Sequence, residues 1–292
     1  MPVTHMTTFG ALPALRIEAD DGAHTTVTLF GAHLVSWQSA DGKEQLFCSS
    51  RSALDGSRAI RGGVPLIFPQ FGEQGAGMRH GFARVCTWRH VDSGTDGAAA
   101  YADFALTDQD LPPALAQAWP HAFALRLRVS VCADQLQLCF DVANTGAHAF
   151  AFATALHSYL ALEPQGPARI AGLRDVRYVD AATPSATAAA APLAQTETLL
   201  CVDAKIDRIY RDVPGPLLLT SGARTLRLEQ SGFRDAVVWN PGALDAAALP
   251  DMADDDYERF VCIEAALITP AVLEAGARWR GWHRISAGQD TA

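Results

Sequence analysis

Residues 149–162, AFAFATALHSYLAL, alternate between two kinds of side chain with a period of two. The even positions are bulky and mostly apolar, whereas the odd positions carry only methyl groups until His157 and Tyr159. Since successive side chains of a strand point to opposite faces, the stretch predicts a strand with one face packed on a core. The other face, kept small beside a titratable ring, indicates a wall open to a ligand. A histidine that only satisfies hydrogen bonds inside a sandwich explains this stretch equally well.

Further β patterns fill most of the chain, and helical signals are few. The predicted strands lie at residues 15–19, 25–37, 125–131, 136–142, 217–220, 226–230, 236–239, 260–267 and 278–285. Short turn signals between neighbouring runs are typical of antiparallel meanders. The best helical segment is 111–118, which opens with two prolines and closes before Pro120. Without a repeat, a βαβ alternation or a linker, residues 1–292 are predicted to form one large antiparallel β-sandwich.

Composition excludes several classes of function. The net charge of -9 provides no general attraction to nucleic acid or to an anionic membrane. The six cysteines lack C-x-x-C spacing, so we expect reduced core residues and neither a zinc site nor a disulfide framework. There is no signal-peptide pattern and no apolar run long enough to span a bilayer. We therefore expect a cytoplasmic protein. The Ala-rich residues 180–194 are predicted to be a surface loop without a role.

The longest segment with neither period is 49–79, which leads into the motif HGFAR at 80–84. An irregular stretch of this length inside a compact domain is usually functional or disordered, and its interleaved aromatic and aliphatic residues argue against disorder. Its glycines permit close approach of the backbone to a ligand. Arg61 and Arg84 suit bidentate binding of a phosphate or a carboxylate. A lone arginine is more often a solvated surface charge, but two of them with His80 nearby favour a functional site.

Glu264 lies within the apolar run RFVCIEAAL at 259–267. A glutamate is almost never buried without a partner, and burial makes it a candidate base near neutral pH. The alternative is a structural salt bridge to Arg259 or to an arginine of the strand predicted at 278–285. Asp207 alone would be interpreted as a turn or surface carboxylate.

Five motifs occur in order along most of the chain, and together they carry a resemblance to a known family. They are IRGGVPLIFPQFG at 60–72, HGFAR at 80–84, ALHSYL at 155–160, IDRIY at 206–210 and CIEAA at 262–266. This set resembles the aldose 1-epimerase superfamily, specifically its hexose-6-phosphate 1-epimerase branch. The resemblance implies a galactose-mutarotase-like β-supersandwich and interconversion of the α and β anomers of a hexose 6-phosphate.

The same resemblance implies roles for individual residues. His157 would be the general acid and Glu264 the general base. His80 and Asp207 would hold sugar hydroxyls, Arg61 and Arg84 would bind the phosphate, and Gln70 and Phe71 would line the sugar pocket. No metal and no organic cofactor is implied, and we expect a monomer whose partner is a small phosphosugar.

Two departures from the family pattern bear on the pocket. Ala265-Ala266 stand where relatives often have Pro, Asn or Gly, which affects the expected pocket shape. Arg79 adds a third cation, so the sequence leaves open which arginines meet the phosphate. The alternatives are a mutarotase of unphosphorylated hexoses and a non-catalytic sugar-binding module on the same scaffold. A glycosidase would need two catalytic carboxylates, and only Glu264 is a convincing candidate.

Overall fold

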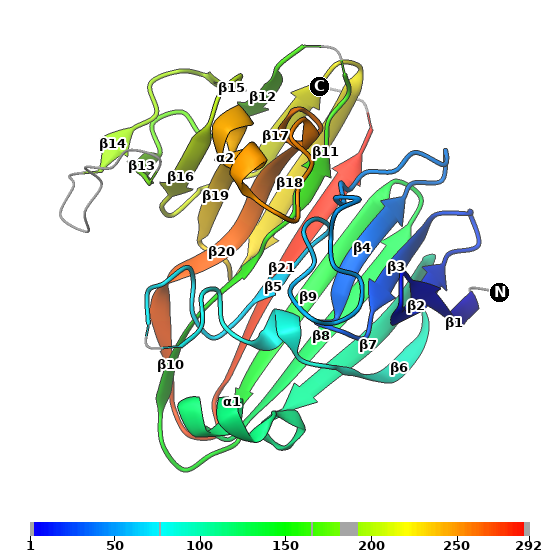
Figure 1. Ribbon diagram of the computed structural model, residues 1–292, viewed down its shortest axis with the longest axis vertical. Helices are drawn as coiled ribbons and strands as arrows, with labels where there is room; N and C mark the ends of the chain where they lie inside the picture. Colours follow the sequence, from blue (N-terminus) through cyan, green and yellow to red (C-terminus); the bar gives the residue numbers. More distant parts are fainter. Residues whose placement is uncertain (1–2, 76, 165, 182–191, 289–292) are drawn as a thin grey trace.

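The computed structural model describes residues 3–75, 77–164, 166–181 and 192–288. Its strands form three antiparallel sheets, which partly overlap in the view of Figure 1. The N-terminal sheet has the order β1 (Val3–Phe9), β2 (Leu12–Glu18), β3 (His24–Thr28) and β4 (His33–Gln38). The predicted antiparallel β architecture is therefore confirmed.

The two larger sheets build the sandwich. The central sheet has the order β14 (Leu193–Ala194), β13 (Arg177–Asp180), β16 (Ile206–Tyr210), β19 (Asp235–Asn240), β20 (Phe260–Leu273), β10 (Phe150–Leu156) and β5 (Leu66–Ile67), with β11 (Tyr159–Ala161) also paired to β20. The long sheet has the order β15 (Leu199–Val202), β12 (Ala168–Ala171), β17 (Leu217–Ser221), β18 (Arg224–Ser231), β21 (Arg278–Ala287), β9 (Gln135–Asn144), β8 (Phe123–Cys132), β7 (Ala99–Thr107) and β6 (Arg89–Asp96).

Helices are short, as the sequence predicted. The described residues form α1 (Pro113–Ala118), α2 (Gly242–Ala248) and the 3₁₀ turns η1 (Ala83–Val85), η2 (Asp108–Asp110) and η3 (Asp256–Glu258). The helix predicted at 111–118 begins two residues late because Pro112 has an extended backbone, with φ −55° and ψ 144°. Nowhere in the described ranges is a helix long and apolar enough to cross a membrane.

The main core lies between the sheets. The bulky face of β10, including Phe152 and Leu156, joins Ile263 of β20 and Phe140 of β9 in one buried apolar cluster. Burying each such side chain contributes about 1.5–3 kcal/mol. This cluster also includes residues of the N-terminal sheet such as Trp37. The expectation of one domain over residues 1–292 remains a prediction, and this shared core supports it.

The second face of the central sheet carries the small residues that the sequence placed there. Ala153, Ala155 and Ala266 form a separate cluster with Ile67 and Phe71. The irregular segment lies at the edge of this sheet, beside β10: Ile67 pairs with Ala155, and the amide of Ala153 donates to the carbonyl of Pro69 at 2.8 Å. The two-faced prediction for residues 149–162 is confirmed, although the strand pauses between β10 and β11.

Several boundaries differ from the prediction. The segment 25–37 is two strands, because Gly31 and Ala32 adopt positive φ values of 79° and 43° in a turn between β3 and β4. β6 has no buried residue, so it lacks the alternation that identifies a strand. All six cysteines are free thiols, but the prediction of core cysteines holds for buried Cys86 and Cys262 and is wrong for exposed Cys201, and the other three are half-buried. Most of the predicted surface loop 180–194 falls in residues 182–191, outside the described ranges.

Candidate active site

Strand pairing of the central sheet places His157 opposite Glu264. At the end of β10, Leu156 pairs with Ala265, and the same register continues into β11. Residue 157 lies between these two strands, so its side chain and that of Glu264 share one face and are cross-strand neighbours. The sequence predicted both residues, and the fold brings them together.

The pair is buried and in direct contact. Nε2 of His157 lies 3.4 Å from Oε1 of Glu264, and the two residues are 8% and 1% exposed. Nδ1 of His157 and Oε2 of Glu264 are buried and have no hydrogen-bond partner among the described residues. Because such orphaned groups cost free energy, finding two of them in one pair indicates a site prepared for a polar ligand.

The alternative of a structural salt bridge to Glu264 finds no support. Arg259 pairs with Asp256 at 3.4 Å. In β21, Arg280 and Arg284 bond to side chains of the neighbouring strand of the long sheet.

Burial shifts the pKa values of Glu264 and His157 in opposite directions. It raises the pKa of Glu264 well above its usual value, and the nearby Asp207 charge acts in the same direction while Arg84 opposes it. Burial also lowers the pKa of His157 well below its usual value, helped by the charges of His80, Arg61 and Arg84. Both shifts favour the neutral form of each side chain.

His80 sits in a strained backbone conformation beside this pair. Its φ is 63°, which is uncommon for a residue other than glycine. Two hydrogen bonds to Gly72 hold it: the His80 amide donates to the Gly72 carbonyl at 2.8 Å, and Nδ1 accepts from the Gly72 amide at 3.3 Å. Its ring lies edge-on to Phe71 and His157, with centroids 5.2 and 5.9 Å away. Burial and three arginines lower the pKa of His80 to about 3, so it is neutral.

The glycines of the irregular segment allow close backbone contacts. Gly63 has a φ of 59°, and a Cβ there would lie 2.1 Å from the carbonyl oxygen of Leu34. Gly81 has a φ of 68°, and its Cβ would lie 2.0 Å from the carbonyl oxygen of Phe68. No side chain fits at either position, so these glycines fix the path of the segments that carry Arg61 and His80.

Arg61 is held from two sides. Its Nε and Nη2 each lie 3.2 Å from the carboxylate of Asp251, and Nη1 donates to the hydroxyl of Tyr159 at 3.1 Å. Three of the five guanidinium N–H groups are used in this way, which leaves two for a ligand. Asp251 neutralises part of the charge of Arg61 and fixes its orientation.

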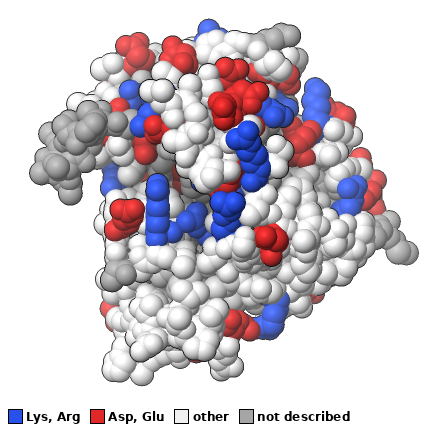
Figure 2. Space-filling model, viewed as in Figure 1, with Lys and Arg blue, Asp and Glu red and all other residues white. Residues whose placement is uncertain are grey.

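The positive charges of Arg84 and Arg79 are less compensated by carboxylates than the charge of Arg61 is. Nη2 of Arg84 donates to the carbonyl of Arg79 at 2.8 Å, while its buried Nε has no partner among the described residues. Burial lowers the pKa of Arg84 to about 10, although Tyr159 acts in the opposite direction, and Arg61 and Arg79 lower it further. The side chain of Arg79 is exposed. Figure 2 shows basic side chains gathered near the middle of this face of the molecule.

Asp207 lies on β16, two strands away from Glu264, and pairs across the sheet with Trp239 of β19. Burial raises the pKa of Asp207 to about 6, against the opposing charge of Arg79. Asp207 also raises the pKa of Glu264, so these two carboxyl groups are close enough to interact. Asp207 is thus in the site, where its sequence context alone suggested a surface residue.

Gln70 and Phe71 have different surroundings. Both polar atoms of the Gln70 amide bond to the adjacent loop: Nε2 donates to the carbonyls of Gly72 and Gly77, and Oε1 accepts from the Gly77 amide at 2.9 Å. Gln70 therefore braces the loop that carries Arg79 and His80. Phe71 packs on the alanines of the central sheet and against His80.

Three residues of the site carried no assignment from sequence. Tyr159 stacks on His157 with centroids 4.9 Å apart and an interplanar angle of 9°. Trp239 lies edge-on to His157 at 5.8 Å. The period of residues 149–162 placed Tyr159 on the face of His157, which was the one available signal. Asp251 and Trp239 become neighbours of the site only through folding.

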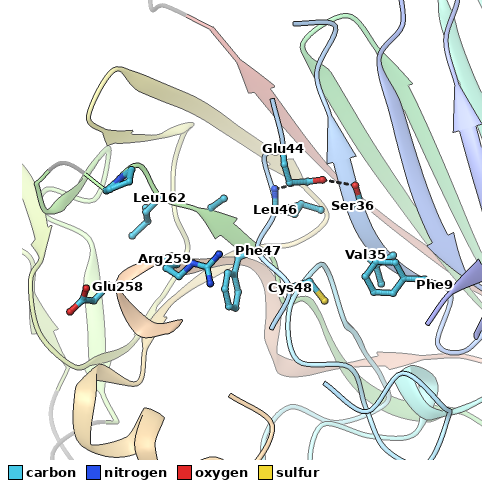
Figure 3. Close-up of a pocket in the computed structure, with 12 residues that line it drawn as sticks. Phe9, Val35, Ser36, Glu44, Leu46, Phe47, Cys48, Leu162, Glu258 and Arg259 are labelled. Carbon is cyan, nitrogen blue, oxygen red and sulfur yellow. Dashed lines mark hydrogen bonds between the residues drawn. The ribbon is translucent and has the colours of Figure 1, made fainter. Parts of the chain in front are cut away.

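A cavity of about 620 Å³ lies elsewhere, between the N-terminal sheet and the end of η3 (Figure 3). Its wall includes Phe47, Leu162 and the exposed Arg259, none of them predicted as site residues. The carboxylate of Glu44 points to Ser36 and also accepts from three backbone amides, so its bonding is internal to the protein. No histidine is among the described residues that line this cavity, so it lacks the paired histidine and carboxyl group found on the central sheet.

The predicted residues thus form one constellation on the alanine-lined face of the central sheet. A histidine and a carboxyl group in contact can donate and accept protons on one ligand. His80, Asp207 and the three arginines add hydrogen-bonding and cationic groups suited to a hydroxylated or anionic compound. No trio of His, Cys, Asp or Glu side chains within the described ranges is arranged to hold a metal ion.

Known proteins share the sequence pattern and the fold of this chain. The sequence pattern of the aldose 1-epimerase family matches residues 13–286. A Cenchrus ciliaris protein named as a candidate glucose-6-phosphate 1-epimerase is 31% identical over 275 residues, which cover 89% of this chain and 80% of that protein.

Solved structures agree in fold. The crystal structure of a candidate mutarotase from Salmonella typhimurium has a TM-score of 0.86 at 26% identity, covering 98% of this chain and 94% of the other. A galactose mutarotase-like protein from Clostridium acetobutylicum has a TM-score of 0.78 at 15% identity and covers 99% of both chains, which confirms the predicted galactose-mutarotase-like fold. With its sequence pattern and its fold in agreement, the chain belongs to the aldose 1-epimerase family.

Proposed function

We propose that this protein interconverts the α and β anomers of a hexose 6-phosphate, with D-glucose 6-phosphate as the first candidate. The observation that carries the proposal is the buried contact of 3.4 Å between His157 and Glu264, with one orphaned polar atom on each residue. The arginines beside this contact support a phosphorylated sugar. The names of the relatives at about 30% identity agree with this substrate.

Anomer exchange needs a proton acceptor and a proton donor on one sugar. Glu264 removes the proton of the C1 hydroxyl while His157 delivers one to the ring oxygen, and the bond between C1 and the ring oxygen breaks. The free aldehyde turns about C1–C2 and recloses on its other face with the two roles reversed. No covalent intermediate forms, and no electrons leave the sugar.

The proton count of the buried pair suits this cycle. Beyond the N–H of a neutral imidazole, the pair carries one transferable proton in either arrangement. In the first arrangement this proton is on Glu264 and His157 is neutral, and in the second it is on His157 and Glu264 is ionised. Ring opening converts the second arrangement into the first, and reclosure restores it. Burial favours the neutral arrangement, and the charges of Arg61 and Arg84 also disfavour a charged His157. The polar groups of the bound sugar, helped by the effect of Arg84 on Glu264, must therefore stabilise the ionised arrangement.

His80 and Asp207 are placed to hold the sugar hydroxyls. His80 is neutral and its Nδ1 accepts from Gly72, so its Nε2 carries a hydrogen that can be donated. Asp207 is ionised above pH 6 and accepts hydrogen bonds from hydroxyl groups. Phe71 and the alanines of the central sheet supply the apolar wall.

The three arginines of the site differ in whether a carboxylate already binds them. Arg84 has an unpartnered Nε, and Arg79 is exposed, so both have donors free of carboxylate partners in the described part of the chain. Arg61 has two donors left but shares its charge with Asp251. We therefore expect Arg84 to contribute most to phosphate binding, with Arg61 and Arg79 assisting.

The test is anomer exchange by NMR saturation transfer, on glucose 6-phosphate and on free glucose. Wild type should accelerate exchange of the phosphosugar, and Glu264→Gln and His157→Asn should each remove most of this acceleration. Arg84→Gln should raise KM for the phosphosugar about tenfold or more, since a charge-assisted bond is lost, with little effect on free glucose. The matched control is Arg280→Gln, which removes an exposed arginine paired with Asp141 on the long sheet.

Two other outcomes would redirect the assignment. Equal acceleration of both sugars would identify a mutarotase of unphosphorylated hexoses. Line broadening of a sugar without any exchange would identify a sugar-binding module and contradict the catalytic proposal.

A further inference from the structure

Tyr159 contacts both the catalytic histidine and an arginine of the site. Its ring is 2% exposed and nearly parallel to the imidazole of His157, with centroids 4.9 Å apart. Its hydroxyl accepts a hydrogen bond from Nη1 of Arg61 at 3.1 Å. Within the described part of the chain, Tyr159 is the one side chain that both stacks on His157 and forms a hydrogen bond with Arg61.

The tyrosine ring is itself firmly held. It packs on Phe260 with centroids 5.0 Å apart and meets the edge of Trp239 at 6.0 Å. Phe260 in turn stacks on Phe47 at 4.9 Å, and these rings belong to one buried cluster. A ring fixed on several sides can transmit its position to whatever stacks on it, because packed side chains have few alternative rotamers.

In the described part of the chain, no hydrogen bond fixes the ring plane of His157. Nδ1 has no hydrogen-bond partner in the described part of the chain, and Nε2 faces the carboxyl group with which it must exchange protons. Many catalytic histidines are oriented by a hydrogen bond to the second ring nitrogen, and here that bond is missing. Ring contacts therefore set the plane of this imidazole: His80 and Trp239 meet it edge-on, and Tyr159 is the ring that stacks on its face.

We propose that Tyr159 is a positioning residue whose ring sets the plane of the His157 imidazole and whose hydroxyl holds Arg61 in the same assembly. The ring therefore acts on turnover, through the angle at which His157 meets Glu264 and the sugar. The hydroxyl acts on substrate binding, through the direction in which Arg61 presents its two remaining N–H groups. The kinetic consequences rest on the proposed anomerase function, whereas the ring orientation does not.

Two substitutions separate the two roles. Tyr159→Phe keeps the ring and removes the hydroxyl, so kcat should stay within about twofold of wild type while KM for glucose 6-phosphate rises about three- to tenfold. Tyr159→Leu removes the ring, so kcat should fall about 10- to 100-fold because the proton donor is no longer aligned.

The matched control is Phe47→Leu. Phe47 is buried in the same aromatic cluster and stacks on Phe260, but it makes no ring contact with His157. It loses similar apolar area, so a merely structural effect of Tyr159→Leu should appear equally in Phe47→Leu. Thermal unfolding of both variants checks that they are folded to a comparable degree.

A spectroscopic measurement tests the stacking without any substrate. In protein with isotope-labelled histidine, the ring protons of His157 are assigned by their loss in His157→Asn. The ring current of Tyr159 should shift them upfield in wild type, in Tyr159→Phe and in Phe47→Leu, and this shift should disappear in Tyr159→Leu.

The possible results decide between the alternatives. Equal losses of kcat in Tyr159→Leu and Phe47→Leu, or wild-type ring shifts in Tyr159→Leu, would overturn the positioning role of the ring. A wild-type KM in Tyr159→Phe would remove the role of the hydroxyl. If Tyr159→Leu does not fold, the ring shift in wild type still tests the stacking, and the KM of Tyr159→Phe still tests the role of the hydroxyl. If no sugar is anomerised by wild type, the proposed function fails, while the ring shifts still report on Tyr159 alone.

Discussion

Oε1 of Glu264 and Nε2 of His157 lie 3.4 Å apart across antiparallel strands of the central sheet, and both residues are almost completely buried. A carboxyl group in this position loses the hydration that stabilises its charge. The same contact is therefore useful for proton transfer and costly for the folded state.

The first prediction concerns Glu264→Gln. This change keeps the size of the side chain and removes the proposed base, so the exchange rate should fall about 10²- to 10⁴-fold. The folded-state pKa of Glu264 lies above its unfolded value of 4.5, so wild type loses stability as pH rises above about 4.5. The variant escapes this loss, and urea unfolding should show its advantage growing from pH 5 to pH 8. Glu258→Gln, an exposed position, should change neither quantity.

A second prediction follows from the buried histidines of the core. Burial lowers the pKa of His33 and of His283 to about 4, from 6.5. Each contributes stability that is fully present above about pH 6.5 and is lost as pH falls towards 4, amounting to about 3 kcal/mol. His283→Gln should therefore flatten the pH dependence of urea unfolding in this range, whatever its effect at neutral pH. An unchanged slope would contradict burial of the neutral ring, and the exposed His148→Gln serves as control.

The third prediction concerns the acid limb of the pH–rate profile. Burial raises the pKa of Asp207 to about 6, and its ionised form binds hydroxyls more strongly than its neutral form. For wild type, kcat/KM should decline as pH falls below about 6. Asp207→Asn should be less active at pH 7 and should lack this limb. Persistence of an identical limb in the variant would assign it to another group.

Gln70 provides a fourth prediction. Its amide bonds to the backbone of Gly72 and Gly77, so Gln70→Ala should loosen the loop that carries Arg79 and His80. We expect faster limited proteolysis between residues 72 and 80, and a KM for glucose 6-phosphate about three- to tenfold higher. Gln137→Ala removes a comparable side chain from the long sheet as control. A higher KM with unchanged proteolysis would indicate direct contact with the sugar instead.

The cysteines give a fifth prediction. Burial raises the pKa of Cys48 to about 12 and that of Cys86 to about 11, and it raises the pKa of Cys262 well above its usual value. Since the thiolate is the reactive form, these residues should resist thiol reagents in the folded protein. Exposed Cys201 should react first, and Cys201→Ser should abolish this fast phase. Mass spectrometry of the labelled protein identifies the modified residue.

Residues 149–162 illustrate how far periodicity alone can reach. Alternation requires only local geometry, so it identified a strand, its core face and the shared face of His157 and Tyr159. The same reasoning failed for β6, whose side chains face solvent on both sides and need not alternate. It also extended one strand across the turn at Gly31, because apolar residues continue through it.

The sequence by itself determined which chemical groups are present and which way many of them face, because these follow from residue type and from a period of two. The tertiary structure decided which groups meet. Strand register paired Glu264 with His157, where the sequence also allowed an arginine, and folding brought Asp251 to Arg61 across 190 residues. Such contacts depend on non-local pairing and on the path of irregular loops, and neither is encoded in the pattern of any single segment.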